Sequence, residues 1–454
     1  MKNKAIKIAC LSALLLLLPL VAALTAAAEE SIPQKMVNVM ELGAAGDGVT
    51  DDTAAINRAA ALLCDGDTLY FPKGVYLIHA AEGAAPVIRV EGKRDVTIQL
   101  HDEAELRLAA VPDGYTDSMN RTFMLYLNAC ENITLTGGTL VGDALLYTGS
   151  IPMEHSFAVN ITDCHGVTVR DVEIKQMRGD GIYVTSVIRV EGVRQNSRNI
   201  TVEDCHIHDC YRNGIALITT DGCVIRNTVI HGIQGRMPQA AVDIEAQYEG
   251  TANRNVLIEN CSFYGNGTQS VAVSGLSENI AIVSTDMEQR VVLGKAATDL
   301  RITDCTVDFV GVYGKSCVIE GTTLGYVGLY GGEVACTDCT FDGKGLIPYR
   351  VLVTKSDGQA KGDFTNCTFV GRGLCALGGS LVLCHTRPAS LTFTDCQFRS
   401  CGLIPFLGRL GTVERESCAF RPGIALWGCL TLCMAAAALL LYRRRKRRVW
   451  VSKT

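Results

Sequence analysis

The sequence predicts an all-β chain wound into the stacked coils of a single-stranded parallel β-helix. Three observations indicate this fold: a strand-like phrase recurs along the chain, each copy contains an Asp or Asn at the same place, and a Cys follows it. The clearest copies lie at 199–207, 255–263, 299–307, 334–341, 362–369 and 390–398. Successive Asp or Asn positions are roughly 17 to 33 residues apart, a spacing that fits one coil per repeat.

Within each copy, apolar and polar residues alternate, as they do in a strand with one buried face. Ile200 and Val202 illustrate the alternation in the first clear copy. An Asp or Asn then interrupts it, and these residue types tolerate a left-handed backbone most readily after Gly. We therefore predict bends at Asp204, Asn227, Asn260, Asp304, Asp338, Asn366 and Asp395.

Cysteine is unusually frequent, with 20 residues in the chain. Seven of them occupy the Cys position of the repeat: Cys205, Cys261, Cys305, Cys339, Cys367, Cys396 and Cys418. We expect mostly free thiols that serve as small apolar side chains inside the coil. Disulfides between coils are the alternative, because neighbouring coils are about 4.8 Å apart. Cys336 and Cys339 form a CxxC pair without a second pair at zinc-site spacing, so the sequence predicts no metal site.

The two ends of the chain carry targeting patterns. Residues 1–28 combine early lysines, an apolar run and a final Ala triplet, which is typical of a secretory signal peptide. Residues 422–442 predict a transmembrane helix, because six consecutive basic residues follow them and argue against a buried core helix. The basic tail at 443–454 would then be cytoplasmic. We expect an exported protein, anchored in the cell membrane, whose residues 29–421 form one extracellular β-helix domain.

The extracellular part is acidic, with 47 acidic against 32 basic residues and a formal net charge of −15. This balance argues against nucleic acid as a partner. A polyanionic substrate such as a polyuronate would need a local basic groove or a bridging cation. Arg178, Arg212 and Arg236 are the candidates for such a groove. Nothing in the sequence indicates the oligomeric state.

Residues 39–76 read VMELGAAGDGVTDDTAAINRAAALLCDGDTLYFPKGVY. The glycines allow a tight turn, and Asp51 or Asp52 can cap an amphipathic helix over 53–63. This segment resembles the opening of the pectate-lyase-like superfamily, in the branch of rhamnogalacturonase-like and epimerase-like proteins and polygalacturonases. The resemblance implies a right-handed parallel β-helix whose N-terminal end is capped by that helix.

Three consecutive coils open with strands that can be aligned at 180–184, 213–217 and 240–244. If Ile182 and its equivalents point inward, the alternation sends Tyr183, Asp243 and Glu245 outward. Asp243 and Glu245 would then lie about 6.6 to 6.8 Å apart along the strand, near the lower limit for the carboxyl pair of an inverting glycosidase. One could act as a base that activates water, and the other, held neutral, could protonate the leaving oxygen.

Asp180 lies two coils earlier, roughly 10 Å away by the coil spacing, and is the third candidate catalytic residue. Tyr183 could stack on a sugar ring. The remaining candidates for substrate binding are Asn213 and the arginines Arg178, Arg212 and Arg236. We interpret His206, His208 and His231, which flank the bends, as surface or turn histidines.

The resemblance also has a clear gap. Polygalacturonases carry Asn-Thr-Asp, a paired Asp-Asp, Gly-His-Gly and Arg-Ile-Lys in that order. Here 178–180 reads Arg-Gly-Asp and 211–213 reads Tyr-Arg-Asn, although 241–246 resembles the family's GIDIEP. Polygalacturonase activity of that standard type is therefore not expected.

We expect an extracellular protein that acts on polysaccharide. The first hypothesis is a glycoside hydrolase that cleaves plant-type or host glycans and needs no cofactor. A uronate-specific polysaccharide lyase, which could use calcium, is the alternative among enzymes. A non-catalytic surface protein that binds glycans or mediates adhesion is the alternative outside them.

Overall fold

The computed structural model of the chain describes residues 34–422, apart from segments at 113–120, 148–153, 188–195, 249, 343–349, 354–359, 372–381, 385–388, 402–405 and 409–411. The predicted signal peptide (1–28) and cytoplasmic tail (443–454) lie outside the described residues. So does the predicted transmembrane segment (422–442), except for Pro422, which ends a strand. Within the described ranges, no helix is both long enough and apolar enough to span a membrane.

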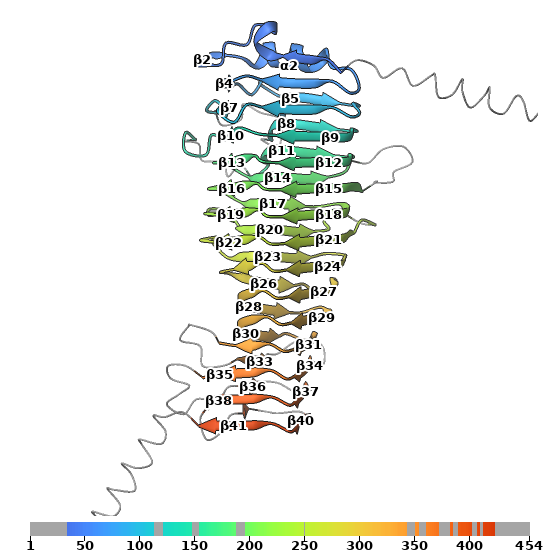
Figure 1. Cartoon of the computed structure of the whole chain (residues 1–454), viewed down its shortest axis with the longest axis vertical. Helices are drawn as coiled ribbons and strands as arrows, with labels where there is room; N and C mark the ends of the chain where they lie inside the picture. Colours follow the sequence, from blue (N-terminus) through green and yellow to red (C-terminus); the bar gives the residue numbers. More distant parts are fainter. Residues whose placement is uncertain are drawn as a thin grey trace, which may run out of the picture.

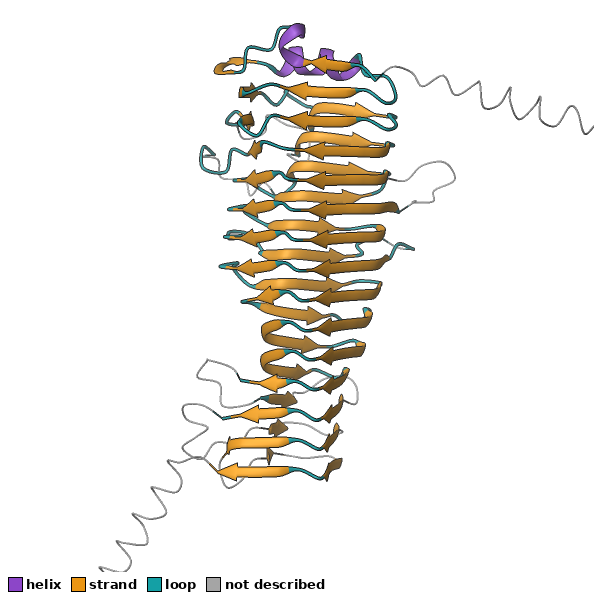
Figure 2. Cartoon of the chain, viewed as in Figure 1, coloured by secondary structure: helices purple, strands orange, loops and turns teal. Residues whose placement is uncertain are grey.

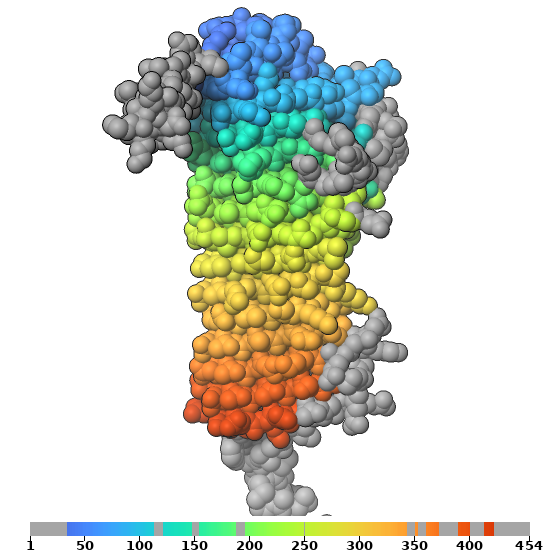
Figure 3. All heavy atoms as spheres, turned by 90° about the vertical axis from the view of Figure 1, so that its right-hand side faces the viewer, coloured from blue at the N-terminus to red at the C-terminus, as the bar shows by residue number. Residues whose placement is uncertain are grey.

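The described chain winds into a column of stacked coils in which each strand pairs in parallel with a strand of the next coil (Figure 1). Almost every described element is a strand, and the coils follow one another in sequence order along the column (Figures 2 and 3). This confirms the predicted all-β, parallel architecture. A 15-stranded sheet and a 26-stranded sheet run along the column.

The 15-stranded sheet takes one strand from each coil. Its strands are β1 (Met36–Asn38), β3 (Thr68–Phe71), β6 (Thr97–Leu100), β9 (Glu131–Thr136), β12 (His165–Arg170), β15 (Ser197–Glu203), β18 (Thr220–Arg226), β21 (Asn253–Glu259), β24 (Ser277–Val283), β27 (Thr298–Thr303), β29 (Lys315–Glu320), β31 (Glu333–Thr337), β34 (Ala360–Thr365), β37 (Ala389–Thr394) and β40 (Thr412–Glu416).

The 26-stranded sheet contains two ladders of strands. The ladder after the bend comprises β2 (Asp47–Asp51), β4 (Gly74–Ile78), β7 (Ala104–Leu108), β10 (Thr139–Val141), β13 (Glu173–Lys175), β16 (His206–His208), β19 (Val229–His231), β22 (Ser262–Tyr264), β25 (Asp286–Met287), β32 (Thr340–Phe341), β35 (Thr368–Val370), β38 (Gln397–Cys401) and β41 (Ala419–Pro422). The ladder that follows it in each coil comprises β5 (Pro86–Glu91), β8 (Thr122–Asn128), β11 (Ser156–Thr162), β14 (Asp180–Thr185), β17 (Asn213–Leu217), β20 (Ala240–Glu245), β23 (Gln269–Ser274), β26 (Arg290–Leu293), β33 (Val351–Val353), β36 (Val382–Cys384) and β39 (Phe406–Gly408). Two longer strands, β28 (Thr306–Val312) and β30 (Thr323–Leu329), belong to both ladders.

The bends and the interior follow the repeat. All seven predicted bend residues have positive φ, between 50° and 56°. Six of the seven repeat cysteines are buried, Cys418 is partly buried, and all seven are free thiols. The predicted inward residues of the aligned coils are fully buried: Ile182, Val184, Ile215, Leu217, Val242 and Ile244. The alternation read from the sequence therefore assigns the two faces of these strands correctly.

The N-terminal end contains the described helices, η1 (Val39–Leu42) and α2 (Thr53–Ala61). Helix α2 lies at the first coils of the column (Figure 1) and buries Ile56 among its small residues. It begins at the predicted residue 53 but ends at residue 61, two residues earlier than the predicted end at residue 63. The Asp52 carboxylate accepts hydrogen bonds from the backbone N–H groups of Ala45 and Gly46, at 2.6 and 3.1 Å, and thereby fixes the turn before the helix.

Candidate functional site

Strands β14, β17 and β20 bring the candidate acids to one outer face. Their register aligns Tyr183 with Ala216 and Asp243 across the three coils. Asp180 is aligned with Asn213 of the next coil and lies close enough to Asp243 for that carboxyl group to raise its pKa.

Asp180 is paired with an arginine and is completely buried. Arg212 Nη1 donates to Asp180 Oδ2 at 3.0 Å and to Oδ1 at 3.3 Å. Burial raises the pKa of Asp180 to about 7, with a further contribution from Asp243, although Arg212 opposes the shift. The carboxyl group of Asp180 is thus close to half-protonated at neutral pH.

Asp243 is held in a similar way. It is 3% exposed, and its Oδ2 accepts a hydrogen bond from Asn213 Nδ2 at 3.3 Å. The amide of Asn213 is oriented because its Oδ1 accepts from the Ala240 backbone N–H at 3.2 Å. Burial raises the pKa of Asp243 to about 7, and the neighbouring Glu245 adds to the shift.

Glu245 is less enclosed than the two aspartates and forms the outer part of the cluster. Its Oε2 accepts a hydrogen bond from Gln247 Nε2 at 2.7 Å. Two carboxyl groups with raised pKa values and a more accessible carboxyl group thus lie together on one face. Such a set can supply both a proton donor and a proton acceptor near neutral pH.

A cleft of about 420 Å³ adjoins this cluster on the earlier coils. The lining residues are Arg121, Phe123, Tyr126, His155, Phe157, Asn160, Thr162, Tyr183, Thr185, Ser186, Val187, Gln247 and Tyr248. Phe123, Phe157 and Tyr183 stack across β8, β11 and β14, with ring centroids 5.3 and 4.1 Å apart. No Asp or Glu occurs among these described lining residues. The cleft thus offers an aromatic wall and a weakly basic lining beside buried acids.

The predicted arginines have three different environments. Arg212 lies against Asp180, as described above. Arg236 lies at the surface, where its Nε is 2.6 Å from Glu154 Oε2. Arg178, which was also predicted to bind substrate, is 3% exposed, and its Nε pairs with the buried Asp143 at 2.6 Å.

Asn213 also differs from its expected role. It is fully buried and uses its amide to orient Asp243, so it does not present a free group to the solvent. The acids do not fit a calcium ion either, because both oxygens of Asp180 accept from Arg212. Calcium prefers six to eight oxygen ligands, and the arginine already occupies two of the six carboxylate oxygens of this cluster.

The sequence reasoning missed most of the cleft. Phe123 and Phe157 are opposite each other in the register of β8 and β11. Both strands bury almost every residue, so their sequences lack the clean alternation that marks an outward position. The sequence does place an aromatic residue at the same register position of two successive coils, and this pattern could have predicted an aromatic surface.

Comparisons with known proteins agree with this fold. Residues 36–265 match the family described as rhamnogalacturonase A/epimerase, pectate lyase-like. The uncharacterized protein YclG of Bacillus subtilis (strain 168) is 28% identical over 261 residues, which cover 52% of this chain and 43% of YclG. The mannuronan C5-epimerase AlgE5 of Azotobacter vinelandii is 27% identical over 263 residues, which cover 52% of this chain and 25% of that enzyme. The matched region is thus less than half of either relative.

One solved structure extends the likeness beyond the matched half. The A-module of the Azotobacter vinelandii mannuronan C-5 epimerase AlgE6 aligns with a TM-score of 0.57 and 16% sequence identity. The alignment covers 85% of this chain and 99% of that module. At this level of identity, the likeness shows the fold alone.

Proposed function

Because the chain belongs to the rhamnogalacturonase A/epimerase, pectate lyase-like family, we propose that it acts on an extracellular polysaccharide bound across β14, β17 and β20. One observation carries the proposal: two buried aspartates with pKa values of about 7 lie beside a cleft with an aromatic wall. The patterns at the two ends of the sequence support export and retention at the cell membrane, where this face would meet extracellular glycans.

The reaction that this geometry favours is hydrolysis of a glycosidic bond. Asp243 is the general acid, since its raised pKa keeps a proton available for the leaving oxygen. Glu245 is the base that takes a proton from the attacking water, and it lies about 6.6 to 6.8 Å along the strand, close to the lower limit for an inverting pair. Asp180 and Arg212 set the local charge and position Asp243 from the neighbouring coils.

The cleft supports binding of a sugar chain next to these acids. Tyr183 is the member of the aromatic wall that adjoins the cluster, because it stacks on Phe157 and aligns with Asp243 through Ala216. Stacked rings offer flat apolar faces, on which the C–H faces of sugars pack well. A glycan that lies along the column would therefore contact the cleft and reach Asp243.

A second candidate reaction is lysis or epimerisation of a uronate. The observation that favours it is the charge of the site: Arg212 lies among the acids, and Arg121 and His155 line a cleft without carboxylates. A guanidinium group can neutralise a uronate carboxylate and so ease removal of the neighbouring proton. The name of the related mannuronan C5-epimerase points in the same direction.

The test measures products from a panel of neutral and uronate polysaccharides. Hydrolysis predicts new reducing ends without ultraviolet absorbance, lysis predicts an absorbing unsaturated product, and epimerisation predicts an altered uronate composition without cleavage. Asp243→Asn and Glu245→Gln should each reduce the rate about 10² to 10⁴-fold. Asp286→Asn, which changes an exposed carboxylate on β25, is the matched control. Equal rates in all variants would remove the proposed site, and inactivity of the parent on every glycan would favour the glycan-binding alternative.

A further inference from the structure

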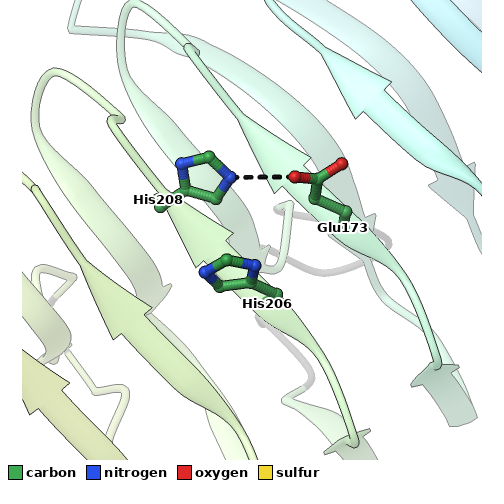
Figure 4. Close-up of side chains that lie close together, drawn as sticks. All are labelled: Glu173, His206 and His208. Atoms are coloured by element: carbon green, nitrogen blue, oxygen red, sulfur yellow. Dashed lines mark hydrogen bonds and ion pairs between the residues drawn. The ribbon is translucent and has the colours of Figure 1, made fainter.

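Three histidines and a glutamate from successive coils face one another on the ladder that follows the bend. His206 and His208 lie on β16, opposite Glu173 and Lys175 of β13, and His231 of β19 lies opposite His208. Figure 4 shows the side chains of Glu173, His206 and His208 gathered on one surface. From the sequence, these histidines were expected to be surface or turn residues, because the strand register that brings them together is not visible in a local pattern.

The potential ligand atoms are close together. One ligand atom each from Glu173, His206 and His208 lies within 4.8 Å of the other two. His208 Nε2 is 3.1 Å from Glu173 Oε1. His231 lies beside this group, because its Nε2 is 2.8 Å from His206 Nε2. Three potential ligands from two coils thus surround a small region of the surface, and the next coil adds a neighbouring imidazole.

A neutral His208 ring has too few N–H groups for its two carboxylate neighbours. Its Nδ1 is 2.7 Å from Asp209 Oδ2, and its Nε2 faces Glu173 Oε1. A neutral imidazole carries one N–H, so it can donate to only one of these carboxylates. If Nδ1–H donates to Asp209, the lone pair of Nε2 points toward Glu173. That contact becomes favourable when a cation lies between the two atoms.

We propose that Glu173, His206 and His208 bind a divalent transition-metal ion of the zinc class. Imidazole nitrogens with one carboxylate are typical zinc ligands, whereas calcium prefers oxygen alone. Three protein ligands leave the fourth position of a tetrahedral zinc ion for a water molecule. Asp209 then orients His208 as a carboxylate behind a metal-bound imidazole.

The ion would tie the coils of β13 and β16 together at the corner that leads to the candidate site. His208 precedes Arg212 by four residues, and Arg212 is the partner of Asp180. Lys175 is a built-in competitor, because its Nζ lies 3.0 Å from Glu173 Oε2. The alternative is a stack of like rings without metal, since His208, His231 and Tyr264 also stack at centroid distances of 5.0 and 4.7 Å.

The test is zinc binding to the full-length protein, purified without a histidine tag. We expect a single zinc ion per chain after dialysis against buffered Zn²⁺, and a melting temperature that rises with zinc and falls again with a chelator. Substitution by Co²⁺ should give the strong visible absorption of a tetrahedral site. Absence of stoichiometric zinc in the folded protein would overturn the proposal.

The variants separate a metal site from ring stacking. His206→Asn and His208→Gln should weaken zinc binding at least about 10-fold, and Asp209→Asn about 10-fold through the orientation of His208. Lys175→Gln should strengthen binding, because it removes the competing cation from Glu173. His165→Gln, on the other sheet, is the matched control and should bind like the parent. Circular dichroism checks that each variant is folded, and equal zinc affinity of all variants and the control would overturn the proposal.

Discussion

Two buried aspartate–arginine pairs in neighbouring coils show how surroundings decide the role of a carboxyl group. Asp143 and Arg178 are both enclosed, and the guanidinium group also lies 4.7 Å from the ring of Tyr147. Both members of that pair are almost fully buried, so we assign it a structural role. Asp180 has a similar partner in Arg212, but its electrostatic neighbour Asp243 adjoins a partly exposed Glu245. The second pair is therefore linked to solvent through a chain of acids.

The stability of the protein should depend on the protonation of Asp243. Its pKa is about 7 in the folded chain, compared with about 3.9 for an unfolded aspartate. The folded state thus binds more protons between about pH 4 and 7, so the contribution of Asp243 to the free energy of unfolding decreases as the pH rises through that window. Relative to Asp243→Asn, the parent should lose on the order of 4 kcal/mol between pH 4 and 8.

Chemical denaturation at a series of pH values measures this difference. Other groups titrate in the same range, so the relevant quantity is the free energy of unfolding of the parent minus that of the variant at each pH. Asp286→Asn provides the reference for an exposed carboxylate. A difference between the parent and Asp243→Asn that stays constant with pH would contradict the raised pKa.

At the scale of the elements, each bend combines a left-handed backbone conformation with side-chain hydrogen bonds to the neighbouring coils. Asn227 adopts a φ of 50°, and its side chain links two coils. Its Nδ2 donates to Asp204 Oδ1 at 3.0 Å, and its Oδ1 accepts from Asn260 Nδ2 at 2.8 Å. The same residue types therefore turn the chain and hold successive turns in register.

Replacement of Asn227 separates these two contributions. Asn227→Gly keeps the left-handed backbone and loses the side-chain ladder. Asn227→Ala loses the ladder and adds backbone strain, so it should be less stable than the Gly variant by about 1 kcal/mol. Thr201→Ala, on the neighbouring strand β15, is the control away from the bend. Urea denaturation measures the order, and a Gly variant less stable than the Ala variant would contradict this account of the bend.

The aromatic wall also belongs to the scale of the elements, because three strands build it. If sugars pack on it, Tyr183→Ala should weaken glycan binding about 2 to 10-fold, in line with about 0.5 to 1.5 kcal/mol for a ring contact. Tyr313→Ala removes an exposed ring that stacks on Tyr330 far along the column. Titration calorimetry with the oligosaccharides of an active polysaccharide compares the two. Equal losses, or a loss only at Tyr313, would place the binding site elsewhere.

At the scale of the whole molecule, the sequence predicted what repeats and missed what does not. The bends, the buried cysteines and the inward face all follow from a period that recurs in each coil. The partner of Arg178 was not predictable, because Asp143 lies 35 residues away and outside the repeat. The cluster around His208 was missed for a related reason: its members converge through the register of three coils, which no local pattern specifies.

The stacking of coils also explains how strands that each carry few functional side chains can form a site together. Each coil adds one or two outward side chains, and the parallel register sets those of neighbouring coils close together. Asp180, Asn213 and Asp243 come from three coils and meet on one face. The central claim is that this face of the column binds the polysaccharide.

The most direct test is a crystal structure of the Asp243→Asn variant with an oligosaccharide of the polysaccharide on which the parent is active. We predict sugar rings along the face of β14, β17 and β20, with one ring against Tyr183 and a glycosidic oxygen next to residue 243. An oligosaccharide bound to the 15-stranded sheet, or on the later coils away from Asp180, would contradict the account.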